Sequence, residues 1–232
     1  MSRSVVFALI TAACLSAAAK RAFYKKPALY KMMMAPAISG DYEVYRTRSV
    51  KYYFSPQAKR FLPMVRRTFE WYLTAMERDF GVEAAPTVVM HNDEETMKNA
   101  INVKDGRAPL GAYYLGVIHI LSPGAWTDDD AQAVERFLSE GPVVHEMAHY
   151  MLDLKTGGNY ETWFSEGVAL YFEYKYMGAQ WRPDLEEESR RVTLDDLSKR
   201  FEKIDKRLAY RRSFDIIKDI VSEKGESAIF DI

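Results

Sequence analysis

The chain has 232 residues, of which 48% are hydrophobic, so it is long enough to bury one sizeable core. Lysine and arginine number 32 and aspartate and glutamate 33, which leaves a formal net charge of −1. This balance gives no electrostatic basis for binding nucleic acid, because the basic residues are scattered apart from a cluster near the N-terminus. The single cysteine, Cys14, excludes an intrachain disulfide.

The first 19 residues have the pattern of a targeting segment. Arg3 precedes the apolar run VVFALITAACLSAAA at 5–19, which is shorter than the roughly 20 residues of a membrane span. The run fits the apolar core of a signal peptide with a small-residue cleavage site at 17–19. Basic residues follow at once, so an uncleaved N-terminal membrane anchor is the main alternative. Lipidation of Cys14 and a helix buried in the domain are two others. We expect an extracytoplasmic protein, which is secreted, periplasmic or membrane-anchored.

The next segment, 20–45, is basic and irregular, which predicts a linker or a loosely attached arm before a domain at 46–232. In the first half of that domain, residue patterns predict strands and helices in alternation. In chain order these are a strand at 49–55, a helix at 56–80 closed by Gly81, a strand at 86–91, a helix to about 101, and a strand at 112–121 kinked at Gly116.

The second half of the domain reads mainly as helices. They are expected at 128–139, from Pro142 to about Asp153, and at 161–177 with Gly178 as the end, followed by two or three more. Strands alternate with helices only in the first half. The order therefore predicts one α+β domain with a small sheet and a helical C-terminal half.

The helix expected from Pro142 carries the sequence VVHEMAHY at 143–150. Residues four apart lie on one face of a helix, so His145 and His149 can bind the same metal ion. Glu146 is rotated by about 100° from His145, where it can reach a water held on that ion. Zinc lowers the pKa of such a water to about 7, and a neighbouring carboxylate can then take its proton. The alternative is a buried helix with two hydrogen-bonded histidines.

A catalytic zinc ion needs a third protein ligand and one open position. Downstream, WFSEGVALYFEY at 163–174 places Glu166 on a helix that is otherwise rich in apolar residues. Residues 150–165 leave room for a loop, and Gly157 and Gly158 supply a turn. The alternative for Glu166 is a solvent-facing carboxylate near a helix N-terminus, where the helix dipole favours negative charge.

The pair HEMAH and WFSEGVALYFE resembles the gluzincin group of zinc metallopeptidases, and most of all its compact peptidase MA-like domains. The resemblance is strong over 140–175 and follows the order of elements over 49–232. It implies a zincin-like fold with a small mixed sheet and an edge strand over the site. It also implies that His145, His149 and Glu166 bind one zinc ion and that Glu146 is the general base.

In such enzymes a strand just upstream of the motif helix, the position of 112–121 here, lies above the zinc and binds an extended peptide. The aminopeptidase branch carries a glutamate on or beside this strand, but GAYYLG at 111–116 has no acidic residue. This departure favours cleavage within a peptide over removal of its first residue.

Further positions have a functional and an ordinary interpretation. His119 can face the cleft, but His119 and His91 are more often ordinary surface or core histidines. Tyr210 resembles the tyrosine that donates to the developing oxyanion, although packing explains most tyrosines. Asp153 can support a ligand histidine or can simply be polar at a helix end. Trp163 is expected to pack.

The function expected from these motifs is zinc-dependent hydrolysis of peptide bonds in peptides or proteins, by endopeptidase cleavage with a zinc-bound water that Glu146 activates. The main alternative is a zinc-binding module without turnover that binds a protein partner. A metal-free structural domain is a third hypothesis. The sequence gives no indication of an oligomeric state.

Overall fold

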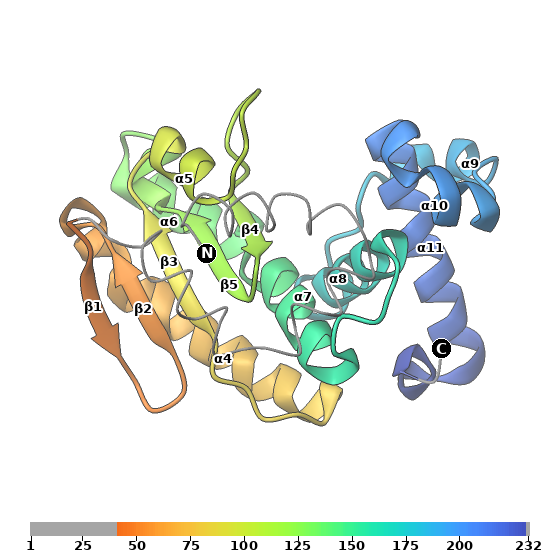
Figure 1. Cartoon of the computed structure of the whole chain (residues 1–232), viewed down its shortest axis with the longest axis horizontal. Coiled ribbons are helices and arrows are strands. Elements are labelled where there is room, and N and C mark those ends of the chain that lie inside the picture. Colours follow the sequence, from red (N-terminus) through yellow and green to blue (C-terminus); the bar gives the residue numbers. More distant parts are fainter. Residues whose placement is uncertain (1–40, 231–232) are drawn as a thin grey trace, which may run out of the picture. The chain divides into compact units, whose positions relative to one another are not determined.

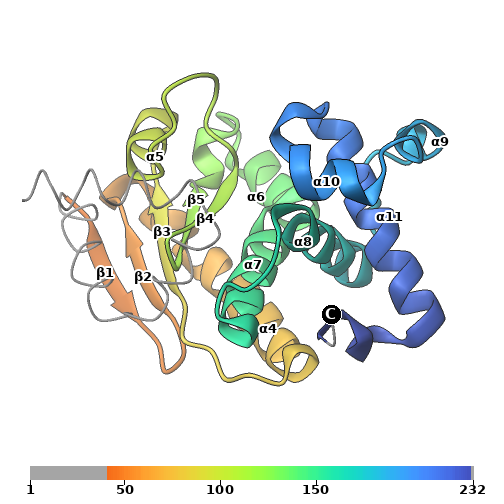
Figure 2. The same cartoon turned by 45° about the vertical axis from the view of Figure 1, so that its right-hand side comes forward.

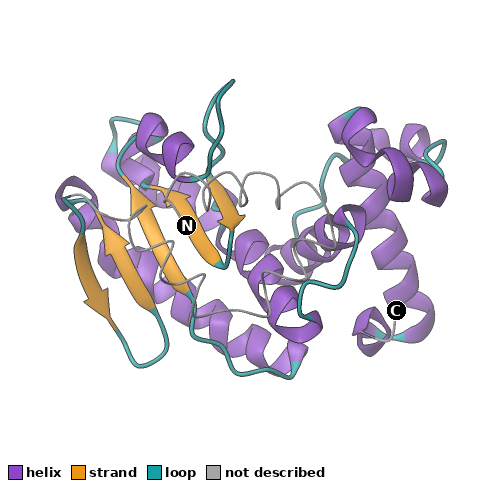
Figure 3. Ribbon diagram, viewed as in Figure 1, coloured by secondary structure: helices purple, strands orange, loops and turns teal. Residues whose placement is uncertain are grey.

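The chain divides into two compact units, Met1–Asn159 and Tyr160–Ile232 (Figure 1). The structure is a computed structural model that describes residues 41–230. The expected signal peptide or anchor at 1–19, with Cys14, and residues 20–40 of the arm expected at 20–45 lie outside the described residues. All the described strands belong to the first unit, and the second is helical (Figure 3). The α+β class is therefore confirmed, although the sequence predicted one domain over 46–232.

The first unit is built on an open, mixed sheet of five strands. In chain order they are β1 (Glu43–Arg46), β2 (Lys51–Phe54), β3 (Thr87–His91), β4 (Gly111–Tyr114) and β5 (Val117–Leu121). Their order in the sheet is β1-β2-β3-β5-β4. The three inner strands are parallel, and both edge strands, β1 and β4, pair antiparallel with their neighbours. Since β1 begins at Glu43, the sheet starts within the segment that was expected to be an arm.

Successive side chains of a strand point to opposite faces of the sheet. Tyr52, Val88 and Ile118 are in register and buried, and Tyr52 packs edge-on against Phe69 of α4 (Leu62–Phe80). Helix α4 lies beside α7 (Val143–Thr156), and α7 contacts β4 and β5 (Figure 2). On the opposite face, α5 (Glu94–Ala100) covers the sheet through Met97. The sheet is thus covered by helices on both faces.

The prediction of a single strand at 112–121 is wrong. The residues form a hairpin of β4 and β5, with Gly111 opposite Ile120 and Tyr114 opposite Val117. Leu115 and Gly116 turn the chain with φ of 50° and 77°. Two successive residues with positive φ are the mark of a tight hairpin turn. Consequently β4 is an edge strand, and β5 lies between β3 and β4.

Helix α6 (Asp130–Glu140) leads into α7. Its first turn is capped by the Asp129 carboxylate, which accepts hydrogen bonds from the amides of Ala131 and Gln132. A Cβ on Gly141 would lie 2.1 Å from the carbonyl oxygen of Phe137, so only glycine fits where the chain leaves α6. The unit also contains the short helices η1 (Pro56–Phe61) and η2 (Pro123–Ala125).

The second unit is helical, and its first helix, α8 (Thr162–Met177), ends at Gly178 as predicted. The other helices are α9 (Glu186–Ser189), α10 (Leu194–Arg200), α11 (Lys206–Lys224), η3 (Pro183–Leu185), η4 (Phe201–Lys203) and η5 (Glu226–Phe230). The fully buried Arg211 guanidinium holds this unit together, because it is paired with Glu186 at 3.0 Å and Asp215 at 2.7 Å. Within 41–230, no helix has both the length and the apolar character needed to cross a bilayer.

Candidate metal centre

Helix α7 holds the two motif histidines on one face. It begins after Pro142 and ends at Gly157, whose φ of 64° is left-handed and closes the helix. His145 and His149 are half-buried, and their ring centroids are 4.8 Å apart with the ring planes at 78°. The spacing predicted from the sequence therefore brings the two imidazoles side by side. The helix runs to Thr156, three residues beyond the predicted end.

Glu146 is buried, with 7% of its surface exposed, and it faces the edge strand β4. Its Oε2 accepts a hydrogen bond of 2.6 Å from the main-chain amide of Tyr113. A Cβ on Gly111 would lie 2.4 Å from Pro142 and 2.8 Å from Cγ of Glu146, so glycine lets the strand approach the helix this closely. The main chain of β4 thus holds the carboxylate that the sequence predicts to be the base.

Glu166 lies in the second turn of α8 and is half-buried. Its neighbour Gly167 has a packing role, since a Cβ there would lie 2.5 Å from the carbonyl oxygen of Ser213 on α11. His145, His149 and Glu166 form a group whose potential ligand atoms all lie within 4.8 Å of one another.

This donor set fits zinc. Two imidazole nitrogens and one carboxylate oxygen form a ligand set that catalytic zinc sites use, and they leave a fourth position open. Zinc binds such ligands at about 2.0–2.2 Å, so a tetrahedral ion separates its ligands by about 3.4 Å. Ligand atoms within 4.8 Å of one another are compatible in spacing with one shared ion.

Tyr210, the predicted oxyanion donor, lies half-buried on α11. Its ring centroid is 6.1 Å from that of Trp181 and 5.9 Å from that of Phe201, and the Lys206 ammonium lies 5.0 Å from it. Aromatic packing thus accounts for much of its side chain, and its catalytic role stays a prediction.

His91 and His119 are core histidines, each only 1% exposed. Nε2 of His91 lies 2.9 Å from Nδ1 of His119, and the Tyr42 hydroxyl lies 2.7 Å from Nδ1 of His91. Burial lowers the pKa of His91 to about 4, against a smaller opposing effect of Asp93, and burial with the neighbouring His91 lowers the pKa of His119 to about 3. Both histidines are therefore neutral at physiological pH, and substrate binding by His119 was the wrong alternative.

Nothing in the sequence singles out Tyr113, although the sequence does single out Asp153, to which Tyr113 is hydrogen-bonded. Asp153 is 6% exposed, and its Oδ2 accepts a hydrogen bond of 2.5 Å from the Tyr113 hydroxyl. The Tyr113 ring stacks on that of His149, with centroids 6.5 Å apart and planes at 18°. Trp163 is buried as predicted, and its indole N–H donates to Glu161 at 2.7 Å. Only the apolar, aromatic character of the strand could have pointed to Tyr113.

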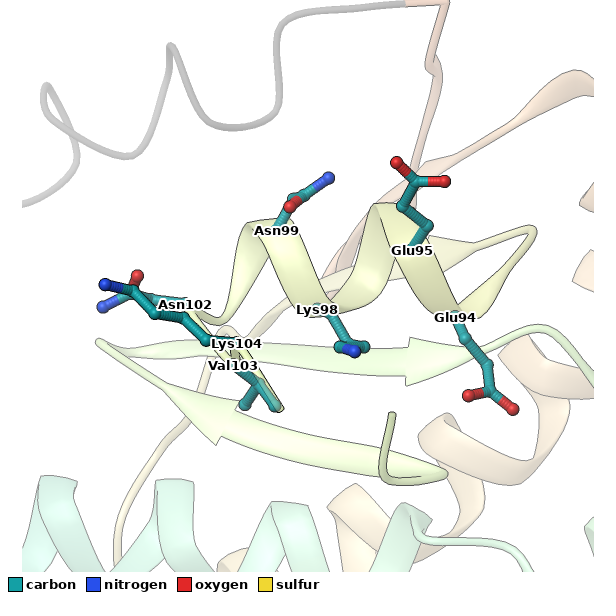
Figure 4. Close-up of a pocket in the computed structure, with 7 residues that line it drawn as sticks. All are labelled: Glu94, Glu95, Lys98, Asn99, Asn102, Val103 and Lys104. Carbon is teal, nitrogen blue, oxygen red and sulfur yellow. The ribbon is translucent and has the colours of Figure 1, made fainter. Parts of the chain in front are cut away.

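A surface pocket of about 530 Å³ lies elsewhere in the first unit, along α5 and the segment after it (Figure 4). Its lining is mixed in charge and mostly exposed. Glu94 is bound to Arg107 at 2.9 Å, and Lys98 donates to the carbonyl oxygen of Gly106 at 2.7 Å. These charges serve local structure, and the pocket holds none of the predicted site residues. It is lined by Glu94, Glu95, Lys98, Asn99, Asn102, Val103 and Lys104.

The geometry of these side chains is the basis for any assignment of function. Comparisons of the chain with protein-family models, with curated proteins and with solved structures find no match.

Proposed function

We propose that this protein is a zinc metallopeptidase of the gluzincin type, with a zincin-like fold, that hydrolyses peptide bonds. His145, His149 and Glu166 would hold one zinc ion, and Glu146 would act as the general base. The observation that carries the proposal is the grouping of those three ligand atoms within 4.8 Å, two of them on the helix that also carries Glu146. The resemblance of HEMAH and WFSEGVALYFE to the gluzincin motifs supports it.

The zinc ion would supply Lewis acidity, which lowers the pKa of a coordinated water and polarises the peptide carbonyl. Glu146 takes the proton of the attacking water and then delivers it to the leaving amine. Its burial and the bond from the Tyr113 amide fix the carboxylate for both transfers. Tyr210 is the proposed donor to the developing oxyanion.

Cleavage within a chain is the proposed specificity. Strand β4, Gly111–Tyr114, is an edge strand that can bind an extended peptide through main-chain groups other than the Tyr113 amide, which donates to Glu146. It carries no carboxylate that would bind the free amine of a substrate. The proposed substrates are therefore peptides or proteins cleaved at internal bonds.

The test uses denatured casein and the purified protein without a histidine tag. Wild type is expected to cleave casein, to lose this activity with a zinc chelator and to recover it when zinc is restored. Glu146→Gln should keep its zinc and lose about 10²- to 10⁴-fold in kcat. If wild type and Glu146→Gln both bind zinc and leave casein and a broad peptide library intact, the chain is a zinc-binding partner module. If neither binds zinc, it is a metal-free domain.

We also propose that the protein works outside the cytoplasm. The support is the apolar run at 5–19 behind Arg3, which has the length and flanks of a signal sequence. Mass spectrometry of the protein from a secreting bacterial host should find a new N-terminus after 17–19, or the intact chain in the membrane fraction. Intact protein in the cytoplasmic fraction would contradict this proposal.

A further inference from the structure

Tyr113 makes four separate contacts with the motif helix α7. Its amide donates to Glu146 at 2.6 Å, its ring stacks on His149, and its hydroxyl donates to Asp153 at 2.5 Å. A fourth contact, edge-on with the ring of Tyr150, has centroids 6.1 Å apart. A single strand residue therefore touches a predicted ligand and the predicted base, and all these residues belong to the first unit.

The register of the hairpin places Tyr113 in this position. Gly111 and Tyr113 pair with Ile120 and Ile118, so their side-chain positions share the face that α7 covers. Tyr114 points to the opposite face, where it packs against the cluster around Met97 under α5. The two neighbouring tyrosines of β4 are thus matched in chemistry and differ in the helix they contact.

Asp153 gives the Tyr113 ring a fixed orientation. A carboxylate that is 6% exposed needs hydrogen-bond donors, because burial of an uncompensated charge costs several kcal/mol. The hydroxyl of Tyr113 is such a donor, and a bond to a charged acceptor is stronger than one between neutral groups. With its amide and its hydroxyl both held, the ring between them has little freedom to move.

We propose that Tyr113 and Asp153 are positioning residues of the metal centre, with the Tyr113 ring fixing the His149 imidazole and the Tyr113 amide fixing Glu146. The inference rests on the proposed zinc peptidase function and deepens it. Ligand histidines need outer partners that set the orientation of the ring, and loss of such a partner typically costs 10- to 100-fold in metal affinity or activity. Here the partner is an aromatic face that a buried carboxylate holds in place.

The experiment compares Tyr113→Phe, which keeps the ring, and Tyr113→Leu, which removes it, with the matched control Tyr114→Phe. The zinc dissociation constant is measured by competition with a coloured chelator, and the visible spectrum of the cobalt-substituted protein reports ligand geometry. Tyr113→Phe should weaken zinc binding about 10-fold and Tyr113→Leu nearer 100-fold, with an altered cobalt spectrum. Tyr114→Phe should leave the affinity and the spectrum as in wild type.

Casein cleavage and a double-mutant cycle add readouts that a merely structural role would not move. Tyr113→Phe should lower kcat and leave KM nearly unchanged, because it disturbs the orientation of the ligand His149 rather than peptide binding. Combining it with Asp153→Asn should add little to either single change, because both remove the same bond.

Circular dichroism verifies that each variant is folded, and Tyr113→Phe decides the matter if Tyr113→Leu unfolds. Wild-type zinc affinity, cobalt spectrum and kcat in a folded Tyr113→Phe protein would overturn this inference alone. Absence of zinc from wild type would overturn the proposed function as well.

Discussion

The first unit contains two pairs of histidines that differ in burial and in hydrogen bonding. His145 and His149 are half-buried on one face of a helix, with rings 4.8 Å apart at 78°. His91 and His119 are buried on neighbouring strands, with parallel rings 5.2 Å apart and a hydrogen bond between them. The ring nitrogens of the helix pair belong to a group of three potential metal ligands. In the strand pair, ring nitrogens form hydrogen bonds with each other and with the Tyr42 hydroxyl.

From this contrast we expect the setting of a histidine, rather than its proximity to another, to decide its role. Deep burial lowers the pKa of both strand histidines and keeps them neutral without a metal. The helix pair is only half-buried, and its two rings lie on one face of α7. We therefore expect changes to the two pairs to have separate effects, on zinc binding for one and on stability for the other.

The largest effect is expected from removing one member of each pair in turn. His149→Ala should reduce the zinc content from about one ion per chain to near zero after dialysis, because two remaining ligands hold the ion poorly. Casein cleavage should vanish with it. His119→Met has a similar volume and should keep its zinc. Elemental analysis measures both variants, and equal zinc content in the two would contradict the contrast.

Removing the metal should destabilise only a protein that still has its helix pair. A ligand that binds the folded state at 100 times its dissociation constant stabilises it by about 2.7 kcal/mol. Urea unfolding of wild type with and without chelator should show a difference of about this size. His149→Ala should unfold at the same urea concentration in both conditions. A chelator effect in that variant as large as in wild type would mean that zinc binds elsewhere.

The strand pair should make stability depend on pH. The folded-state pKa values of about 4 for His91 and about 3 for His119 lie below the ordinary 6.5, so below pH 6.5 the unfolded chain binds protons that the folded chain does not. Stability is therefore full above pH 6.5 and is lost as the pH falls toward 4. Well below pH 6.5, where the unfolded histidines are fully protonated, the slope approaches about 1.4 kcal/mol per pH unit for each histidine.

Urea unfolding of metal-free protein between pH 7 and 5 measures this slope. His119→Met is the control, since it removes one titrating group and leaves the helix pair in place. Its mean slope over this range should be smaller than that of wild type by about 1 kcal/mol per pH unit, because the unfolded histidine is only partly protonated near pH 6.5. Identical slopes would show that His119 does not contribute.

The smallest effect on stability is expected at Tyr42, which ends the chain of hydrogen bonds through His91 and His119. Tyr42→Phe removes the hydroxyl that bonds to Nδ1 of His91 and leaves a buried nitrogen without that partner. A loss of about 1–2 kcal/mol in unfolding free energy should follow, with zinc binding unchanged. Burial raises the pKa of Tyr42 to about 12, so its hydroxyl stays protonated over the range tested. Tyr45→Phe on the exposed strand β1 is the control, and an equal loss there would contradict a specific role for Tyr42.

The sequence predicted those parts of the molecule that local patterns encode. The helix at 161–177 is bounded by Gly178, and the four-residue spacing of His145 and His149 brings their rings together. The hairpin was missed because the apolar run across Leu115 hides a turn. Leucine rarely adopts a φ of 50°, as Leu115 does here, so a turn at this residue is not expected from the sequence. Gly116 alone predicted only a kink in one strand.

The surroundings of the site depend on strand register, which the sequence alone does not provide. Tyr113 is one of 15 tyrosines, and nothing in its immediate neighbours distinguishes it from Tyr114. Only the pairing of β4 with β5 decides which of the two faces α7. Asp153 was noticed because it follows His149 by four residues, yet the structure connects it to the histidine through an aromatic ring.

The bond between Glu146 and β4 is donated by a peptide amide rather than by a side chain. Most replacements at position 113 would therefore preserve it, with proline as the exception because proline has no amide hydrogen. The vulnerable position is Gly111, two residues away, since any larger residue there would push the strand from the helix. Over evolutionary time, mutation could thus change the side chain of Tyr113 without disturbing the carboxylate, whereas Gly111 should tolerate almost no substitution.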